Sequence, residues 1–145
     1  MRKIVLVVVS VMFLSACSSD KAVPQEEQKT ELTERVRPAA SGGATAAYFV
    51  YTNPLEKADT LISIQTDFAA MAQVHESYKT EDGMMGMREQ KEVIVQPGED
   101  LLFKQGGLHI MLMNTNQELV LGDSVQLDLS FSNAGVVVKK LPVRQ

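Results

Sequence analysis

The sequence predicts an all-β domain, either a β-sandwich or a small barrel with Greek-key connections. From Ala46 onward, short segments rich in apolar and β-branched residues follow one another with turn signals between them. No segment has the three- and four-residue spacing of apolar side chains that a long amphipathic helix requires. The turn signals are Asn53-Pro54, Glu81-Asp82-Gly83, Pro97-Gly98, Gly106-Gly107, Gly122-Asp123 and Asn133-Ala134-Gly135.

The N-terminus has the features of a secretion signal. Arg2 and Lys3 precede an apolar run of about 13 residues, too short for the ~20 residues of a membrane-spanning helix. The run ends at Leu14-Ser15-Ala16-Cys17, which resembles the lipobox of bacterial lipoproteins. We therefore expect residues 1–16 to be a signal peptide and Cys17 to be lipidated. The alternative is an ordinary signal peptide that contains a cysteine.

The next segment, residues 17–29, is polar and lacks apolar periodicity, which predicts a flexible tether between the lipidated Cys17 and a domain at residues 30–145. A tether of this length spans roughly 20 Å. The predicted location is extracytoplasmic and lipid-anchored. Ser18 after Cys17 resembles an outer-membrane sorting signal, so in a Gram-negative host we expect the periplasmic side of the outer membrane; with a single membrane, the anchor would lie on its outer face.

Length and charge narrow the function classes. The chain has 145 residues, so removal of the signal leaves enough for one domain with a proper core. Its formal net charge is -4 and no dense cluster of Lys or Arg is present. Binding to nucleic acid depends mainly on neutralising phosphates with such clusters, so we expect no nucleic-acid partner.

The predicted domain begins with an edge strand at residues 31–36, and the small-residue stretch at 38–46 is expected to interrupt regular structure. Residues 59–68 and 124–133 contain the alternation expected when one sheet face packs and the other meets water. The remaining strands are expected at 46–53, 72–80, 85–90, 92–97, 100–105, 108–114 and 136–143.

The segment GGLHIMLMN, residues 106–114, carries the first chemical signal. Side chains alternate along a strand, so His109, Met111 and Met113 would share one face, while Ile110 and Leu112 would share the other. Ile110 and Leu112 are typical of a buried face, which leaves the histidine and the two thioethers on the opposite side. An exposed methionine face calls for an explanation.

The second histidine lies near another group of methionines. His75 alternates with apolar Val74 and shares a face with polar neighbours, and the turn that follows leads to Met84, Met85 and Met87. Five of the six methionines beyond the predicted signal peptide thus fall in two clusters, and Met71 lies outside them. The simplest interpretation is that these methionines are flexible apolar fillers of the core.

Metal chemistry offers another interpretation. Thioether sulfur is a soft, neutral donor that suits Cu(I), whereas Zn, Mg and Ca prefer thiolate, imidazole or oxygen ligands. Cys17 is the only cysteine, so the domain has no thiolate for a blue-copper site or a zinc finger. Thioethers cannot form disulfides in an oxidising compartment, which agrees with the secretion signal. The two clusters therefore predict a soft, cuprous site.

The spacing of these residues resembles a known signature. His75, eleven residues, Met87, twenty-one residues, His109, one residue and Met111 resemble the His-Met pattern of the periplasmic Cu(A) chaperone (PCuAC) family. The similarity covers most of the mature chain, including VHESYKTEDGMMGMR and VIVQPGEDLLFKQGGLHIMLMN. The resemblance implies a cupredoxin-like Greek-key β-sandwich that binds one Cu(I) near its surface. It also implies delivery to extracytoplasmic targets such as the Cu(A) centre of cytochrome c oxidase subunit II, often alongside Sco-type thiol proteins.

The resemblance also implies a ligand set and shows two departures. The expected metal ligands are His75, Met87, His109 and Met111, with possible additional ligands or supporting residues at Met84, Met85 and Met113. Many members of the family have Met directly after the first histidine, where this chain has Glu76. Members are also commonly soluble in the periplasm, whereas this chain has an apparent lipid anchor, which affects how copper would be delivered.

The function expected from these observations is transfer of copper, not catalysis. A weak, exposed site of neutral ligands would release Cu(I) to a partner with thiolate ligands. Two alternatives remain open: copper storage or detoxification, and a lipid-anchored β-sandwich that binds protein or ligand without metal. We do not expect an enzyme, because no nucleophile has a base near it in the sequence.

Overall fold

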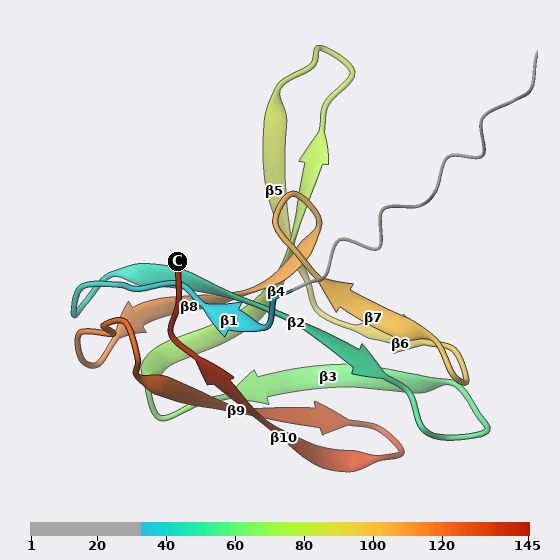
Figure 1. Ribbon diagram of the computed structural model, residues 1–145. Coiled ribbons are helices and arrows are strands. Elements are labelled where there is room, and N and C mark those ends of the chain that lie inside the picture. Colours follow the sequence, from blue (N-terminus) through green and yellow to red (C-terminus); the bar gives the residue numbers. More distant parts are fainter. Residues whose placement is uncertain (1–32) are drawn as a thin grey trace, which may run out of the picture.

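Two antiparallel β-sheets stack face to face in the computed structural model, which describes residues 33–145 (Figure 1). The predicted signal peptide at 1–16, the lipidation site Cys17 and the tether at 17–29 lie outside the described residues. Within residues 33–145, no helix has the length and apolar character needed to cross a membrane. The all-β class expected from the sequence is confirmed for this part of the chain.

The larger sheet has the order β1-β2-β8-β4-β5, and β7 pairs with the second half of β2. The smaller sheet has the order β10-β9-β3-β6. Neighbours in each sheet are mostly distant in sequence, so the chain crosses repeatedly between the sheets, as in a Greek key. The strands are β1 (Arg35–Val36), β2 (Ala44–Thr52), β3 (Asp59–Gln65), β4 (Ala69–Lys79), β5 (Met85–Gln90), β6 (Val93–Val95), β7 (Asp100–Phe103), β8 (Leu108–Thr115), β9 (Ser124–Phe131) and β10 (Gly135–Pro142).

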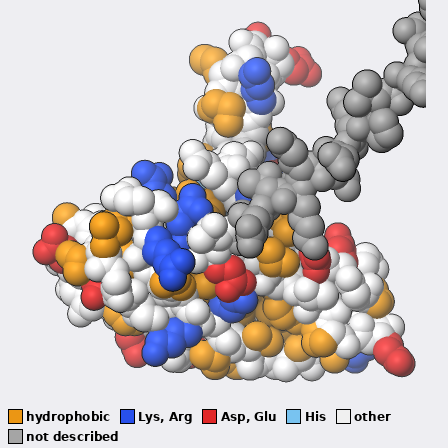
Figure 2. All heavy atoms as spheres, in the orientation of Figure 1, with side chains coloured by type: hydrophobic (Ala, Val, Ile, Leu, Met, Phe, Trp, Pro, Cys, Tyr) orange, Lys and Arg blue, Asp and Glu red, His pale blue; other side chains and the backbone are white. Residues whose placement is uncertain are grey.

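The hairpin formed by the end of β4 and by β5 projects beyond the two sheets (Figure 1). Thr80 closes its turn through bonds to Met84 in both directions, and Gly83 adopts a positive φ of 81° that favours glycine. Gly86 lies under the ring of Tyr78, where an added Cβ would come within 2.5 Å of ring carbon Cζ. Figure 2 shows hydrophobic side chains on this exposed hairpin.

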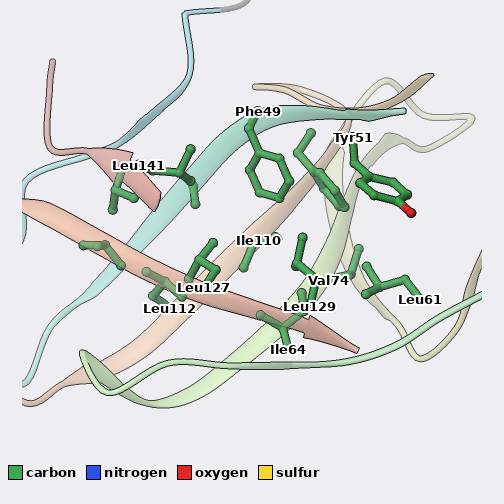
Figure 3. Close-up of a cluster of buried hydrophobic side chains, with 14 of the residues drawn as sticks. Phe49, Tyr51, Leu61, Ile64, Val74, Ile110, Leu112, Leu127, Leu129 and Leu141 are labelled. Carbon is green, nitrogen blue, oxygen red and sulfur yellow. The ribbon is translucent and has the colours of Figure 1, made fainter. Parts of the chain in front are cut away.

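The core lies between the sheets because alternate side chains of each strand point inward. Ile110 and Leu112 of β8 are fully buried and lie on the same inward side as Leu127 and Leu129 of β9 (Figure 3). Each such side chain contributes about 1.5–3 kcal/mol by leaving water. Aromatic pairs extend the core: the ring centroids of Phe49 and Phe103 lie 4.7 Å apart, and those of Tyr51 and Phe131 lie 4.3 Å apart.

The expectation that residues 38–46 interrupt regular structure is wrong at its C-terminal end, since β2 begins at Ala44. Gly42, with a φ of 75°, makes the turn that precedes the strand. Ala44 and Ala46 then pair with Met113 and Met111 of β8. The low intrinsic strand preference of alanine is overridden here by pairing with a neighbouring strand.

Candidate metal centre

Strands β4 and β8 bring the two histidines together. His75 and His109 are direct register partners, and their ring centroids lie 6.2 Å apart with the rings inclined at 67°. The adjacent residues Val74 and Ile110, also register partners, point into the core. The imidazoles therefore lie on the outer face of the larger sheet, as alternation along each strand requires.

The two predicted methionine ligands share this face. Met111 lies two residues after His109 on β8, so it points to the same side. Met87 of β5 pairs with Ser77 of β4, which lies two residues after His75. Met87 is therefore the diagonal neighbour of His75 across the hairpin. Diagonal neighbours on one sheet face have Cβ atoms roughly 7–8 Å apart, within the reach of a methionine side chain. The register thus gathers all four predicted ligands on three adjacent strands.

The three additional candidates lie farther from the histidines. Met85 pairs with Lys79 toward the tip of the hairpin, and Met84 lies in the turn itself. Both are strongly exposed. Met113 lies on the outer face two residues beyond Met111, where it pairs with Met71 of β4. The structure therefore separates these methionines from the histidine pair, although Met85 and Met113 share its face.

The ring of His109 is fixed by a backbone carbonyl. His109 is buried, with 4% of its surface exposed, and its Nδ1 lies 3.0 Å from the carbonyl oxygen of Gly107. A carbonyl oxygen only accepts, so Nδ1 carries the proton and donates it. The lone pair of the neutral ring is then on Nε2. An outer hydrogen bond of this kind is the usual device that orients a metal-binding histidine.

The ring of His75 is held by a chain of side-chain hydrogen bonds. Its Nε2 lies 3.2 Å from Oε1 of Gln73, and Nε2 of Gln73 donates to Oε1 of Glu89 at 3.0 Å. Because Oε1 of Gln73 accepts, Nε2 of His75 is the nitrogen that carries the proton. Its Nδ1 is buried and has no hydrogen-bond partner among residues 33–145. An unpaired buried nitrogen costs free energy that a bound metal would recover.

Gln73 and Glu89 were not identified from the sequence. Gln73 lies two residues before His75 on the same strand face, and Glu89 is the register partner of His75 on β5. Alternation along β4 could have indicated Gln73. Glu89 could be found only by counting back across the hairpin turn, which depends on the register that the turn sets.

Glu76, the position that departs from the family pattern, faces the other way. It accepts hydrogen bonds from Arg88 and Gln90 at 2.8 and 2.7 Å, and it pairs with the Arg88 guanidinium at 2.7 Å. Residue 76 lies next to His75, so alternation turns it away from the imidazoles. The departure from the pattern therefore falls outside the histidine and methionine face.

The site is less exposed than the sequence suggested. His109 is buried and His75 and Met111 are partly buried, whereas Met87 is 53% exposed. The site is thus most exposed where it meets the hairpin of β4 and β5, which carries Met87. Among the described residues, no three His, Cys, Asp or Glu side chains are placed to hold a metal ion.

Comparison with known sequences identifies one family. The family described as "Putative lipoprotein LpqE-like" matches residues 29–143. A protein of Leifsonia xyli subsp. xyli (strain CTCB07), described as "Putative lipoprotein Lxx21020", is 31% identical over 107 residues. This alignment covers 73% of the present chain and 64% of the relative, so the chain spans just under two thirds of the relative's length.

Comparison with solved structures identifies the fold. The apo PCuAC domain from PmoF1 superposes with a TM-score of 0.64 at 21% identity, over 78% of this chain and 90% of that domain. The copper-bound PCuAC domain from PmoF2 gives 0.61 at 18% identity, over 78% and 89%. The Cu(I) form of DR1885 from Deinococcus radiodurans gives 0.57 at 23% identity, over 88% and 83%. The described residues thus have the cupredoxin-like β-sandwich fold of PCuAC domains.

Proposed function

This chain belongs to the LpqE-like lipoprotein family, and on that premise we propose that it is an extracytoplasmic lipoprotein that binds Cu(I) and transfers it to other proteins. The observation that carries the proposal is the pairing of His75 with His109, each with one ring nitrogen left free to bind. Lipidation at Cys17 would hold the domain at a membrane. In a Gram-negative host, the proposed location is the periplasmic side of the outer membrane.

The donor set favours Cu(I) over other ions. Nδ1 of His75 and Nε2 of His109 supply two neutral imidazole donors, and Met111 and Met87 supply thioether sulfur. Neutral, soft donors suit Cu(I), whereas Ca²⁺ and Mg²⁺ require oxygen ligands and structural Zn²⁺ prefers thiolate and imidazole. Glu89, the register partner of His75, is engaged with Gln73. The copper-bound PCuAC domain and the Cu(I) form of DR1885 share the fold, which supports copper as the cargo.

The uneven burial of the ligands suggests an order of release. Met87 lies on the exposed hairpin, so a donor atom of the acceptor can replace it first. His109 is buried and held by Gly107, so it leaves the ion last. Each exchange replaces one neutral ligand with another donor, and no electron is transferred. The chain would act as a carrier and not as an enzyme.

The proposed acceptors are thiolate-bearing copper sites. Thiolate binds Cu(I) more strongly than neutral thioether or imidazole does, so transfer to such a site runs downhill. The Cu(A) site of cytochrome c oxidase subunit II is an acceptor of this kind, and the family resemblance in the spacing of His75, Met87, His109 and Met111 favours it. The same resemblance suggests that Sco-type thiol proteins act alongside the carrier. A tether of about 12 residues would let the domain reach a membrane-bound acceptor.

Competition against a colorimetric Cu(I) chelator under reducing conditions tests the binding. The chain from residue 18 onward, which lacks the Cys17 thiol, should hold one equivalent of Cu(I) against the chelator. His75→Ala and His109→Ala should each weaken binding about 100-fold or more, with Gln65→Ala, at an exposed position of β3, as the control. Absence of stoichiometric copper in the unmodified chain would overturn the proposal. Transfer to a separate Cu(A)-bearing domain then distinguishes delivery from storage, since a storage protein would retain its copper.

A further inference from the structure

A second group of thioethers lies on the outer face of β4 and β8, on the far side of Met111 from the histidines. Met71 and Met113 are direct register partners, and Met111 lies two residues from Met113 on the same face. Directly opposed residues of an antiparallel pair have Cβ atoms roughly 4.5–5.5 Å apart. The register therefore brings three sulfur-bearing side chains together, one of which, Met71, belongs to neither methionine cluster of the sequence.

The surroundings leave these thioethers accessible. On β2, the register partners of Met113 and Met111 are Ala44 and Ala46, whose methyl side chains are too small to cover them. Met71 is 51% exposed, and Met111 and Met113 are partly exposed. The register partner of Met111 on the other side is Gln73, which is uncharged. None of the strand partners of this trio carries a charge.

The presence of methionine at these three positions is informative because all three lie in β-strands. A strand face that only packs or only meets water would more commonly carry β-branched or polar residues. Methionine is unbranched and flexible, so three of them can turn their sulfurs toward a common point. The result is a donor set of three neutral, soft sulfurs without oxygen or thiolate, which suits Cu(I) and its analogue Ag(I) but not Zn²⁺ or Ca²⁺.

We propose that Met71, Met111 and Met113 form a second, weaker Cu(I) site that shares Met111 with the site at the histidines. The inference builds on the proposed function. Because the second site has no imidazole and is more exposed, it binds less tightly than the first. The shared Met111 lets one ion pass between the two sites by exchanging ligands one at a time. The trio is therefore a loading or unloading position along the same sheet face.

Anaerobic titration of the chain from residue 18 onward, with ¹³C-labelled methionine methyl groups, tests the proposal by NMR. Up to one equivalent of Cu(I) should shift the methyl signals of Met87 and Met111. Further Cu(I), up to two equivalents, should shift those of Met71 and Met113, with a dissociation constant about tenfold or more weaker. The double variant Met71→Leu, Met113→Leu preserves apolar volume; it should lose the second event and keep the first. Ile62→Leu, at an exposed position of β3 in the smaller sheet, is the control and should change neither.

The possible outcomes separate this inference from the proposed function. Suppose that Cu(I) shifts the methyl signals of Met87 and Met111, while those of Met71 and Met113 stay unshifted up to two equivalents. The second site is then refuted, and the copper-carrier proposal stands. If Met71 and Met113 respond in His75→Ala, where the first event is lost, the second site is supported independently of the first. Retention of the second event in the double leucine variant also refutes the assignment.

Discussion

His75 and His109 are cross-strand partners whose ring centroids lie 6.2 Å apart on the outer face of the larger sheet. They belong to strands joined through β5, β6 and β7, so only the pairing of β4 with β8 brings them together. A slip of one residue in this register would turn one of the imidazoles toward the core. The candidate site therefore depends on the same register that buries Val74 and Ile110.

Gln73 should control which nitrogen of His75 can bind metal. In Gln73→Leu, Nε2 of His75 loses its acceptor, so the ring is no longer held with Nδ1 free, and we expect Cu(I) affinity to fall about 10-fold or more. Nitrogen NMR of the metal-free protein would report the change of tautomer directly. Gln65→Leu, on the outer side of β3, is the control. An unchanged tautomer and unchanged affinity in Gln73→Leu would remove Gln73 from the site.

Replacing Glu76 should lower the stability of the fold slightly and leave copper binding unchanged. Its carboxylate pairs with Arg88 on the side of the hairpin turned away from the histidines. Exposed pairs of this kind contribute at most about 1 kcal/mol, so Glu76→Gln should lower the free energy of unfolding by no more than that. Its Cu(I) affinity should match that of the unmodified chain. A large loss of affinity would show that residue 76 communicates with the site despite facing away.

Asp59 should make the fold sensitive to acid. Burial alone would raise the pKa of Asp59, but hydrogen bonds from Ala134, Ser132, Asn133 and Thr60 outweigh it and lower the pKa from 3.8 to about 2. A lowered pKa in the folded state means that the carboxylate stabilises the fold above its ordinary pKa. This stability is lost as the pH falls from about 3.8 toward 2.

Replacing Asp59 with Asn tests this expectation. We expect Asp59→Asn to lower the free energy of unfolding at pH 7 by about 2 kcal/mol, as urea denaturation would measure. The deficit should shrink as both proteins are brought to pH 2, because the native carboxylate is then increasingly protonated. Asp67→Asn, on the exposed turn between β3 and β4, is the control. A deficit independent of pH would assign the effect to lost hydrogen-bond geometry and not to charge.

Replacing Tyr51 with phenylalanine should make the fold more stable. Its ring stacks on Phe131 in the core, and its hydroxyl is buried without a hydrogen-bond partner among residues 33–145. Burial, with a smaller contribution from the negative charge of Asp59, raises the pKa of this hydroxyl, so it stays neutral. Tyr51→Phe keeps the ring and removes the unpaired group, and we expect a gain of about 1 kcal/mol in unfolding free energy. A loss of stability would reveal a partner for the hydroxyl.

The sequence predicted the strand pattern and the faces of β8 well. Alternation placed His109, Met111 and Met113 opposite Ile110 and Leu112. The burial of Ile110 and Leu112 and the pairing of His109 with His75 agree with that division, although His109 is itself buried. Local patterns of this kind depend only on the period of a strand, which can be read from one segment.

Features that depend on pairing between strands could not be predicted in the same way. The start of β2 at Ala44, the role of Glu89 and the position of Met71 beside Met113 all follow from which strands are neighbours and in what register. Register is set by the hydrophobic pattern of the whole sheet and by its turns, so single segments do not reveal it.

Copper X-ray absorption spectroscopy of the chain loaded with one equivalent of Cu(I) would test the convergence of His75, His109, Met87 and Met111 most directly. We predict scattering from both imidazole nitrogen and thioether sulfur, with the imidazole contribution reduced in His109→Ala. A spectrum with sulfur scattering alone, unchanged in His109→Ala, would contradict a site built on the paired histidines.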